Sequence, residues 1–330
     1  MSQCEKVLSN KLKEYKIGSI IGQGSFGIVH ILEMDKAPKY VIKIVNLTDP
    51  DYRNKFNKEK ELFKLLTNKQ VKCIHRNINC HLAVENVGDC GYIIAKYYDT
   101  DLDNFLKEGS FSKKVHMDNN NLNIFIKWIK LLIDAVRYIH SKNIAHGDLK
   151  PQNILIRYSD YNLVITDFDT MCIGKLLNST CYVDGLTHLY ASPKLYYSYR
   201  KYISIKVVKE SDIWAVAMII LVMWFGIDKL VNILYAESID NMFPSMYYEK
   251  LNNDDFQTLY NVINNEVENY KISKELAMSK DNIDKCANII QDILTYSAQI
   301  LHKIYNNKHT INDINVYLDK LTNFSEFHIR

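Results

Sequence analysis

A carboxylate, a lysine and an amide lie close together in residues 146–153, as Asp148, Lys150 and Asn153, and Asp167 follows fourteen residues after Asn153. Transfer of a phosphoryl group from ATP needs an oriented hydroxyl and positive charge around the phosphate oxygens, with little covalent chemistry. We expect Asp148 to accept the proton of the substrate hydroxyl and Lys150 to contact the γ-phosphate. Asn153 and Asp167 offer the oxygen ligands that Mg²⁺ prefers. The segment therefore predicts metal-assisted phosphoryl transfer.

A glycine-rich segment, residues 22–29, precedes a short apolar stretch, residues 40–43, that ends in Lys43. Because glycine has no side chain, such a loop can lie close over phosphate groups. A strand lysine downstream of such a loop is typical of a residue that reaches the α- and β-phosphates. Together the two features predict a phosphate-binding site.

This lysine needs an acidic partner to fix its position, and the amphipathic helix expected at residues 52–66 offers Glu59 and Glu61. Glu59 precedes Leu62 and Phe63 by three and four residues, so it adjoins the apolar face of the helix. Glu61 points about 160° away from Glu59 on a helix that turns about 100° per residue. We expect Glu59 to pair with Lys43, and Glu61 is the alternative.

The composition indicates a folded chain of two lobes or one large domain, because 330 residues with 47% hydrophobic content exceed one small core. The net charge of +3 and the scattered basic residues give no reason to expect a nucleic-acid partner. Residues 1–16 contain no apolar core of signal-peptide length. The longest apolar run, residues 213–227, is shorter than the roughly 20 residues of a bilayer span. We therefore expect no membrane span and an intracellular setting, cytoplasmic or nuclear.

The cysteines are odd in number and irregularly spaced, which predicts reduced thiols and not a disulfide framework. A zinc site in the cluster of Cys73, His75, Cys80 and His81 would match no familiar spacing. The seven are Cys4, Cys73, Cys80, Cys90, Cys172, Cys181 and Cys286.

Sequence patterns predict strands in the first part of the chain and mainly helices after residue 97. The polar stretches 107–121 and 251–280 are predicted to be loops. Strands are expected within residues 15–45, 82–87, 92–95, 154–156 and 163–165, and helices at 52–66, 102–106, 123–140, 211–225, 284–302 and 311–321.

In their order along the chain, these motifs resemble those of the eukaryotic protein kinase family over roughly residues 15–322. Matching segments also include residues 75–78, Thr187 within 187–193, and residues 211–214. Thr187 is expected to brace Asp148 and Lys150. Lys150, two residues after the base, is similar to the serine/threonine branch.

The resemblance implies an α+β bilobal fold, with a small β-rich N-lobe that carries one main helix and a larger, mainly helical C-lobe. It divides the chain into an N-terminal extension (1–14), N-lobe (15–97) and C-lobe (98–330), with an activation segment at about 167–193. It implies ATP with Mg²⁺, or alternatively Mn²⁺, and a protein substrate. The implied nucleotide-binding residues are Ile21, Gly22, Gln23, Gly24, Ser25, Phe26, Gly27, Val29, Val41, Lys43, Ala95, Lys96, Tyr98 and Leu155.

Two departures from the family pattern fall in the catalytic segments. Gly147 replaces an arginine that in many members binds a phosphorylated activation loop, so we expect activity without such phosphorylation. Asp169 replaces a glycine whose freedom lets the loop flip, although aspartate tolerates unusual backbone angles better than most residues. Its carboxylate could also lie near the metal.

Two further departures concern packing. Lys194 and Lys308 replace the glutamate and arginine of a buried ion pair in the family, so that pair is predicted to be lost. Ala95 is a small residue at the position that gates the back of the adenine pocket. The pocket is therefore predicted to be unusually deep.

Two alternatives remain open at this point. Gly147 and Asp169 also suit a small-molecule kinase of the aminoglycoside or choline type, although residues 22–29, Lys150 and Thr187 favour a protein kinase. The departures also suit a pseudokinase scaffold, but Lys43, Asp148, Asn153 and Asp167 are all present.

Overall fold

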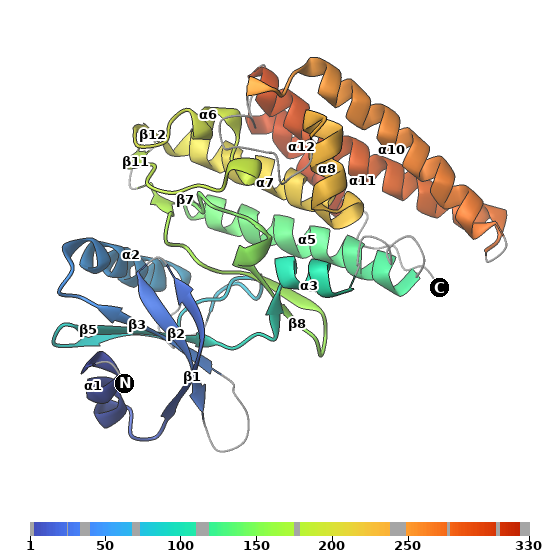
Figure 1. Ribbon diagram of the computed structural model, residues 1–330. Coiled ribbons are helices and arrows are strands. Elements are labelled where there is room, and N and C mark those ends of the chain that lie inside the picture. The colour runs from blue at the N-terminus through green and yellow to red at the C-terminus, as the bar shows by residue number, and fades with distance from the viewer. Residues whose placement is uncertain are drawn as a thin grey trace.

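A five-stranded antiparallel sheet with a helix on each face forms the small lobe (Figure 1). The structure is a computed structural model that describes residues 3–24, 26–33, 40–67, 73–109, 119–174, 179–237, 249–275, 278–307 and 311–323. The sheet order is β1-β2-β3-β5-β4. Its strands are β1 (Lys16–Gly24), β2 (Gly27–Glu33), β3 (Tyr40–Asn46), β4 (Ala83–Val87) and β5 (Cys90–Lys96). The strands predicted at residues 82–87 and 92–95 are confirmed as the antiparallel pair β4 and β5, and Gly88 supplies the positive φ of +58° at the turn of residues 88–89 between them.

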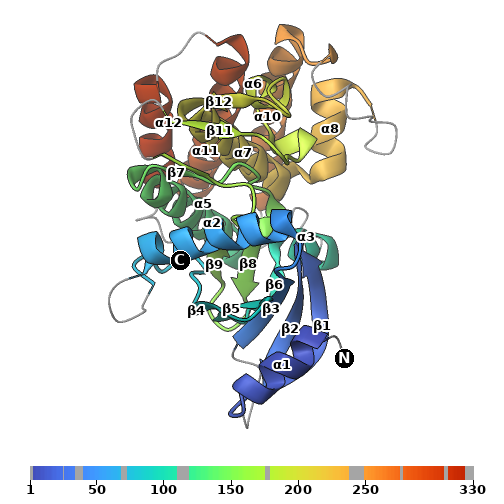
Figure 2. The same cartoon turned by 90° about the vertical axis from the view of Figure 1, so that its left-hand side faces the viewer.

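The helix on the inner face, α2 (Pro50–Leu66), begins two residues before the predicted start. Asp49 caps it by accepting the backbone N–H groups of Asp51 and Tyr52, and Pro50 fits the first helical turn. Its Phe56 packs on the sheet, whereas Leu62 and Leu66 join the core of the large lobe. Figure 2 shows α2 lying between the sheet and the large lobe.

The helix on the outer face, α1 (Gln3–Lys11), lies in the predicted N-terminal extension, for which no helix was predicted. Leu8 is fully buried against Leu32 and Ile42 of the sheet. A nine-residue helix is marginal in isolation, so its stability comes from this packing, which the local sequence does not reveal.

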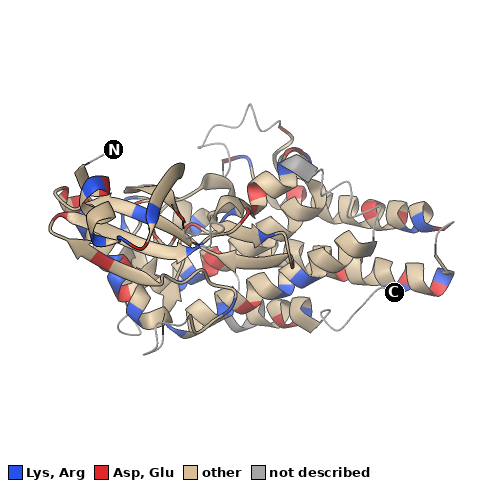
Figure 3. Ribbon diagram, turned by 90° about the horizontal axis from the view of Figure 1, so that it is seen from below, with Lys and Arg blue, Asp and Glu red and all other residues tan. Residues whose placement is uncertain are grey.

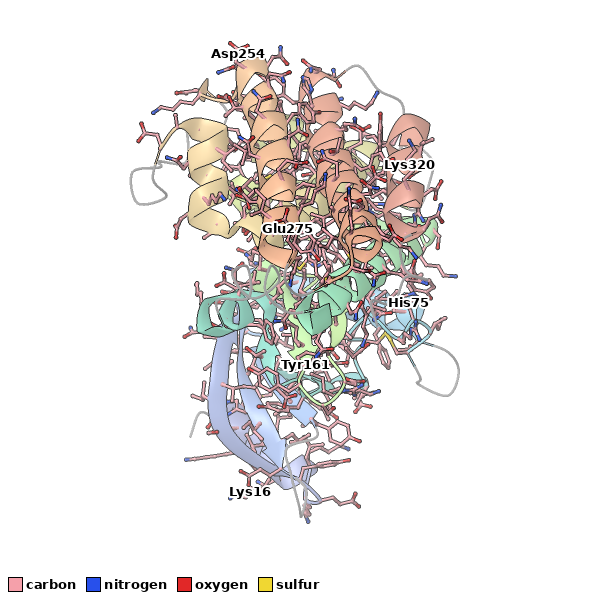
Figure 4. The ribbon with its side chains drawn as sticks, turned by 90° about the vertical axis from the view of Figure 1, so that its right-hand side faces the viewer. Lys16, His75, Tyr161, Asp254, Glu275 and Lys320 are labelled. Carbon is pink, nitrogen blue, oxygen red and sulfur yellow. A yellow bond between two sulfur atoms is a disulfide. The ribbon has the colours of Figure 1, made fainter. Side chains whose placement is uncertain are left out.

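Helices form most of the large lobe, and its central helix α7 (Ile205–Phe225) is almost completely buried. Figure 4 shows Lys16 at one end of the molecule, in the small lobe, and Asp254 at the other, in the large lobe. The other helices are α3 (Leu102–Gly109), α5 (Asn119–Ser141), α6 (Pro193–Tyr196), α8 (Ile227–Tyr235), α10 (Asn253–Lys274), α11 (Lys280–Asn306) and α12 (Ile311–Asn323), with 3-10 turns η1 (Pro151–Asn153) and η2 (His188–Tyr190).

Short strands of the large lobe position its functional loops. In the three-stranded sheet β6-β8-β9, Asp148 lies in the loop before β8 and Asp167 follows β9, and two further pairs join β10 to β7 and β11 to β12. The strands are β6 (Thr100–Asp101), β7 (Ile144–Ala145), β8 (Ile154–Arg157), β9 (Asn162–Ile165), β10 (Cys172–Ile173), β11 (Thr180–Tyr182) and β12 (Tyr202–Ser204).

The prediction of a loop at residues 251–280 is wrong for most of that stretch, which forms α10. Phe256, Leu259 and Ile263 lie buried at helical spacing. Many Asn, Asp and Glu residues separate them, so the average composition of the stretch resembles a loop. Of the loop predicted at 107–121, residues 110–118 lie outside the described residues.

The prediction of reduced thiols is wrong for six of the seven cysteines, because they form the disulfides Cys4–Cys90, Cys73–Cys80 and Cys172–Cys181. Only Cys286 is a free thiol, and it is buried. The pairs are 86, 7 and 9 residues apart, and such pairings cannot be deduced from spacing alone.

Charged side chains of both signs are interspersed along the helices of both lobes (Figure 3). Among the described residues, no single helix is long and apolar enough to cross a bilayer. In the part of the chain that the structure describes, one pair of consecutive helices, α7 and α8, passes that test when taken together, and the chain bends by 114° between them.

Candidate active site

Asp212 of α7 holds the backbone of residues 146–153, here called the catalytic loop. Its two carboxylate oxygens accept the backbone N–H groups of His146 and Gly147 at 2.8 and 2.9 Å. His140 contacts one of these oxygens at 2.8 Å. Asp212 is 1% exposed, so these partners satisfy a buried carboxylate. The start of the catalytic loop is thereby fixed to the core of the large lobe.

Lys150 links the predicted base to the predicted bracing hydroxyl. Its Nζ donates to Asp148 Oδ2 at 2.6 Å and to Thr187 Oγ1 at 3.0 Å. The second oxygen of the base, Asp148 Oδ1, is buried and has no hydrogen-bond partner among the described residues. A carboxylate oxygen that is unpaired, while its neighbour is held by a lysine, is suited to accept a proton from a hydroxyl that comes within hydrogen-bond reach.

Asn153 and Asp167 are the residues that would hold a magnesium ion. Asn153 Nδ2 donates to the backbone oxygen of Asp148 at 2.9 Å, which leaves the amide oxygen as the atom to face a cation. The described residues contain no cluster of three His, Cys, Asp or Glu side chains that could hold a metal. Two oxygen donors fit Mg²⁺, which usually keeps several waters and binds phosphate oxygens. When bound, the ion would neutralise developing charge on the phosphate oxygens.

Asp167 adopts a left-handed backbone conformation, with φ of +61°. Its pKa is raised by desolvation and by the adjacent carboxylate of Asp169, while Lys43 opposes the shift. Asp167 is exposed to solvent, and the neighbouring negative charge of Asp169 disfavours its ionised form. A cation at this position would favour the ionised carboxyl.

Four predicted nucleotide-binding residues share one face of the small-lobe sheet. Lys43 lies opposite Val29 of β2, and Val41 lies opposite Ala95 of β5. Opposite residues in antiparallel strands face the same side, as do residues two apart in one strand. The register therefore brings together four of the fourteen residues predicted to bind the nucleotide.

The other predicted nucleotide contacts are spread around the edge of that face. Ser25 lies outside the described residues. Leu155 is the partly exposed residue between two buried neighbours in β8. Ile21, Gly22, Gln23 and Gly24 end β1, Gly27 begins β2, Lys96 ends β5, and Tyr98 follows it.

Phe26, also predicted to contact the nucleotide, lies with its side chain inside the small lobe. It is 1% exposed and packs with Val45 and with Phe56 of α2. The Lys43 ammonium lies 3.7 Å from the centre of its ring, within the range of a cation–π contact. Phe26 therefore covers one side of the predicted phosphate-binding lysine.

The predicted pair of Lys43 with Glu59 is wrong in this structure. Lys43 Nζ lies 3.2 Å from each carboxylate oxygen of Asp169. Glu59 faces inward as predicted and is 3% exposed, but its Oε2 contacts His81 Nε2 at 2.6 Å. The family pattern has glycine at position 169, so a competing carboxylate there was not considered as a partner of Lys43.

The position of Gly147 is closed to any side chain. Its φ is +83°, and a Cβ atom would lie 2.7 Å from the carbonyl oxygen of Thr170. The arginine that is usual in the family cannot be accommodated without a shift of the backbone. The structure thus gives a local reason for this departure.

The described parts of the activation segment are held by strands and by a covalent link. β10 pairs with β7, and β11 pairs with β12. The Cys172–Cys181 disulfide joins β10 to β11 across residues 175–178, which lie outside the described residues. Asn143 and Gly174 are also joined by two hydrogen bonds of 2.8 Å.

Lys194 is exposed, as expected if the buried ion pair of the family is lost. The segment is instead joined to α7 by Ser192, whose backbone N–H donates to Ser211 Oγ at 2.8 Å. Lys308 stands at the other position of the ion pair that is predicted to be lost, and it lies outside the described residues.

Comparison with known proteins identifies the family. Residues 15–305 match the family model described as protein kinase domain, and the chain therefore belongs to the protein kinase family. This match and the bilobal architecture confirm the predicted family and the α+β fold class.

Several protein kinases are similar to this chain at low identity. Myosin light chain kinase A of Dictyostelium discoideum is 24% identical over 74% of this chain and 74% of its own length. Serine/threonine-protein kinase cds1 of Schizosaccharomyces pombe is 27% identical over 66% of this chain and 46% of its own length. Calcium-dependent protein kinase 6 of Plasmodium berghei is 28% identical over 68% of this chain, but only 14% of that protein is covered. The chain therefore spans less than half the length of two of these relatives.

The sequence did not reveal the roles that three residues have in this site. Asp212 belongs to a segment matched to the family but was not identified as the anchor of the catalytic loop. His81 was considered only for zinc. Asp169 was considered near the metal and not as the partner of Lys43, although its departure from the family pattern was a signal that the site differs.

Proposed function

We propose that the chain is an ATP-dependent serine/threonine protein kinase that is active without phosphorylation of its activation segment. The observation that carries this proposal is the hydrogen bonding of the two carboxylate oxygens of Asp148. One of its oxygens is held by Lys150, which Thr187 braces, and the other is buried with no partner among the described residues. A substrate hydroxyl that reaches this unpaired oxygen would lose its proton to Asp148 as it attacks the γ-phosphate.

Serine/threonine specificity is supported by Lys150, which lies two residues after the base and contacts Thr187 at 3.0 Å. Two similar proteins also bear this activity in their names, serine/threonine-protein kinases cds1 and kin-29. A protein substrate follows from the family to which the chain belongs.

Independence from phosphorylation is supported by Gly147 and by the activation segment itself. The usual arginine that would bind a phosphate group is absent, and its position admits no side chain without a backbone shift. Strand pairing and the Cys172–Cys181 disulfide already hold the described parts of the segment. No phosphate is needed to order these parts.

The test is transfer of labelled phosphate from ATP and Mg²⁺ to a protein mixture by the purified full chain, treated with a phosphatase that is then removed. We expect transfer by the native chain, and a loss of about 100- to 10,000-fold in Asp148→Asn. Asp281→Asn, at an exposed position in α11, is the matched control and should retain activity.

Other outcomes would assign the chain differently. Turnover of only an aminoglycoside or choline would indicate a small-molecule kinase. Nucleotide binding without transfer to any acceptor would indicate a scaffold. Activity only before phosphatase treatment would contradict the proposed independence from phosphorylation.

A further inference from the structure

Among the described residues, Lys43 has two direct contacts, one with a carboxylate and one with an aromatic ring. Asp169 approaches its ammonium with both carboxylate oxygens at 3.2 Å, and the ring of Phe26 lies on another side at 3.7 Å. The side chains of Lys43 and Asp169 are only 15% and 7% exposed. The Coulombic attraction within an ion pair so shielded from water is stronger than that between the same charges at the surface.

In the family pattern Glu59 would form an ion pair with the lysine, but here it has a different partner. Its side chain is 4% exposed and contacts His81 at 2.6 Å. His81 directly precedes the Leu82–β4 stretch, so this contact fastens α2 to the small lobe by a link that does not include Lys43. Leu62 and Leu66 fasten the same helix to the large-lobe core. Helix α2 is thus positioned without the lysine.

We propose that Asp169 is the positioning residue for Lys43 during phosphoryl transfer and takes the place of Glu59; the inference rests on the proposed kinase function. A lysine ammonium has three N–H donors. The two oxygens of Asp169 occupy two of them, and the third remains for a phosphate oxygen. Asp169 acts through Lys43 and does not itself contact the nucleotide.

The segment that carries Asp169 is well anchored for this role. Phe168 is 2% exposed and packs on His146, with ring centres 4.8 Å apart. Thr170 Oγ1 donates to the backbone oxygen of His146 at 3.2 Å. The residues on both sides of Asp169 are therefore tied to the catalytic loop, and the lysine is set directly by the activation segment.

The first test measures the ion pair itself in the nucleotide-free chain. Lys43 is labelled with an amine-reactive reagent, and the rate is followed by peptide mass spectrometry, with Lys107 as an internal reference on α3. Asp169→Asn should label Lys43 about tenfold faster, because the carboxylate that shields and holds the amine is gone. Asp169→Glu should restore slow labelling in part, and Glu59→Gln should leave the rate within about twofold of the native one.

The second test measures phosphoryl transfer with the same variants. Asp169→Asn should lower kcat/KM for ATP by about 100-fold, and Asp169→Gly, which installs the usual family residue, should lose as much. In the Lys43→Met background, Asp169→Asn should add almost nothing, because the two residues act as one unit. Thermal unfolding of each variant separates these effects from misfolding.

Faster labelling in Glu59→Gln together with unchanged labelling in Asp169→Asn would overturn the inference. So would full activity in Asp169→Gly. If the native chain transferred no phosphate, the proposed function would fail, while the labelling rates would still decide whether Asp169 holds Lys43.

Discussion

Cys172 and Cys181 are joined by a disulfide, and their Cα atoms are 5.6 Å apart. The disulfide links the two parts of the activation segment that flank residues 175–178. Both residues pack in or against a small apolar cluster with Ala145 and Ile205 beneath the segment. The link also borders a groove of about 900 Å³ between α2 and the segment. Its removal should therefore loosen the segment without disturbing the large-lobe core.

Cys172→Ser is expected to lower the free energy of unfolding by about 2 kcal/mol, because the unfolded chain is no longer constrained. It should also make residues 174–183 more sensitive to limited proteolysis. Cys73→Ser removes a disulfide elsewhere in the chain and is the matched control, so its activation segment should stay resistant. Equal cleavage of the segment in the two variants would contradict this prediction.

Gly147→Ala is expected to cost about 1 to 3 kcal/mol in the free energy of unfolding, measured by chemical denaturation. The cause is the left-handed φ of +83° together with the carbonyl of Thr170 at 2.7 Å from the new Cβ. Gly22→Ala is the control, because nothing lies within 4 Å of a Cβ there. Comparable stability of the two variants would show that the loop at Gly147 can shift without cost.

Thr187→Ala should lower kcat about tenfold, because Lys150 loses one of the two hydrogen bonds that orient it. Thr187→Ser keeps the hydroxyl and should retain most of the activity. Steady-state kinetics with ATP and a protein substrate measure both variants. Equal loss in the serine variant would mean that the methyl group, and not the contact with Lys150, is what matters.

Ala95→Phe should weaken bulky adenine-site inhibitors while it leaves ATP binding largely intact. Ala95 lies opposite Val41 on the face predicted to meet the nucleotide, and a phenyl ring there would occupy the back of the pocket that the small side chain is predicted to deepen. Inhibition constants for a series of increasing size measure the effect. Bulky compounds that bind the variant as well as the native chain would contradict the prediction of a deep pocket.

The strands of the small lobe and the helices at residues 52–66 and 123–140 were predictable because apolar periodicity decides them locally. Helix α10 was not, since its buried residues are separated by many polar ones. The three disulfides were also beyond prediction, because partners such as Cys4 and Cys90 are brought together only by the packing of α1 on the sheet.

The proximity of Asp148, Lys150 and Asn153 could be predicted because the three residues are close in sequence. The partner of Lys43 could not, since Asp169 is 126 residues away and competes with Glu59 in three dimensions. Periodicity correctly turned Glu59 inward. The periodicity gave no indication that the Glu59 carboxylate would contact His81.

The burial of Phe26 in the small-lobe core has a kinetic consequence for the glycine-rich loop. Lifting the loop away from the phosphates would pull an aromatic ring out of its apolar packing and into water, at a cost of about 2 to 3 kcal/mol. A barrier of that height slows a step by roughly 30- to 150-fold. The residence time of bound nucleotide would thus be set partly by the side chains that pack around this one ring.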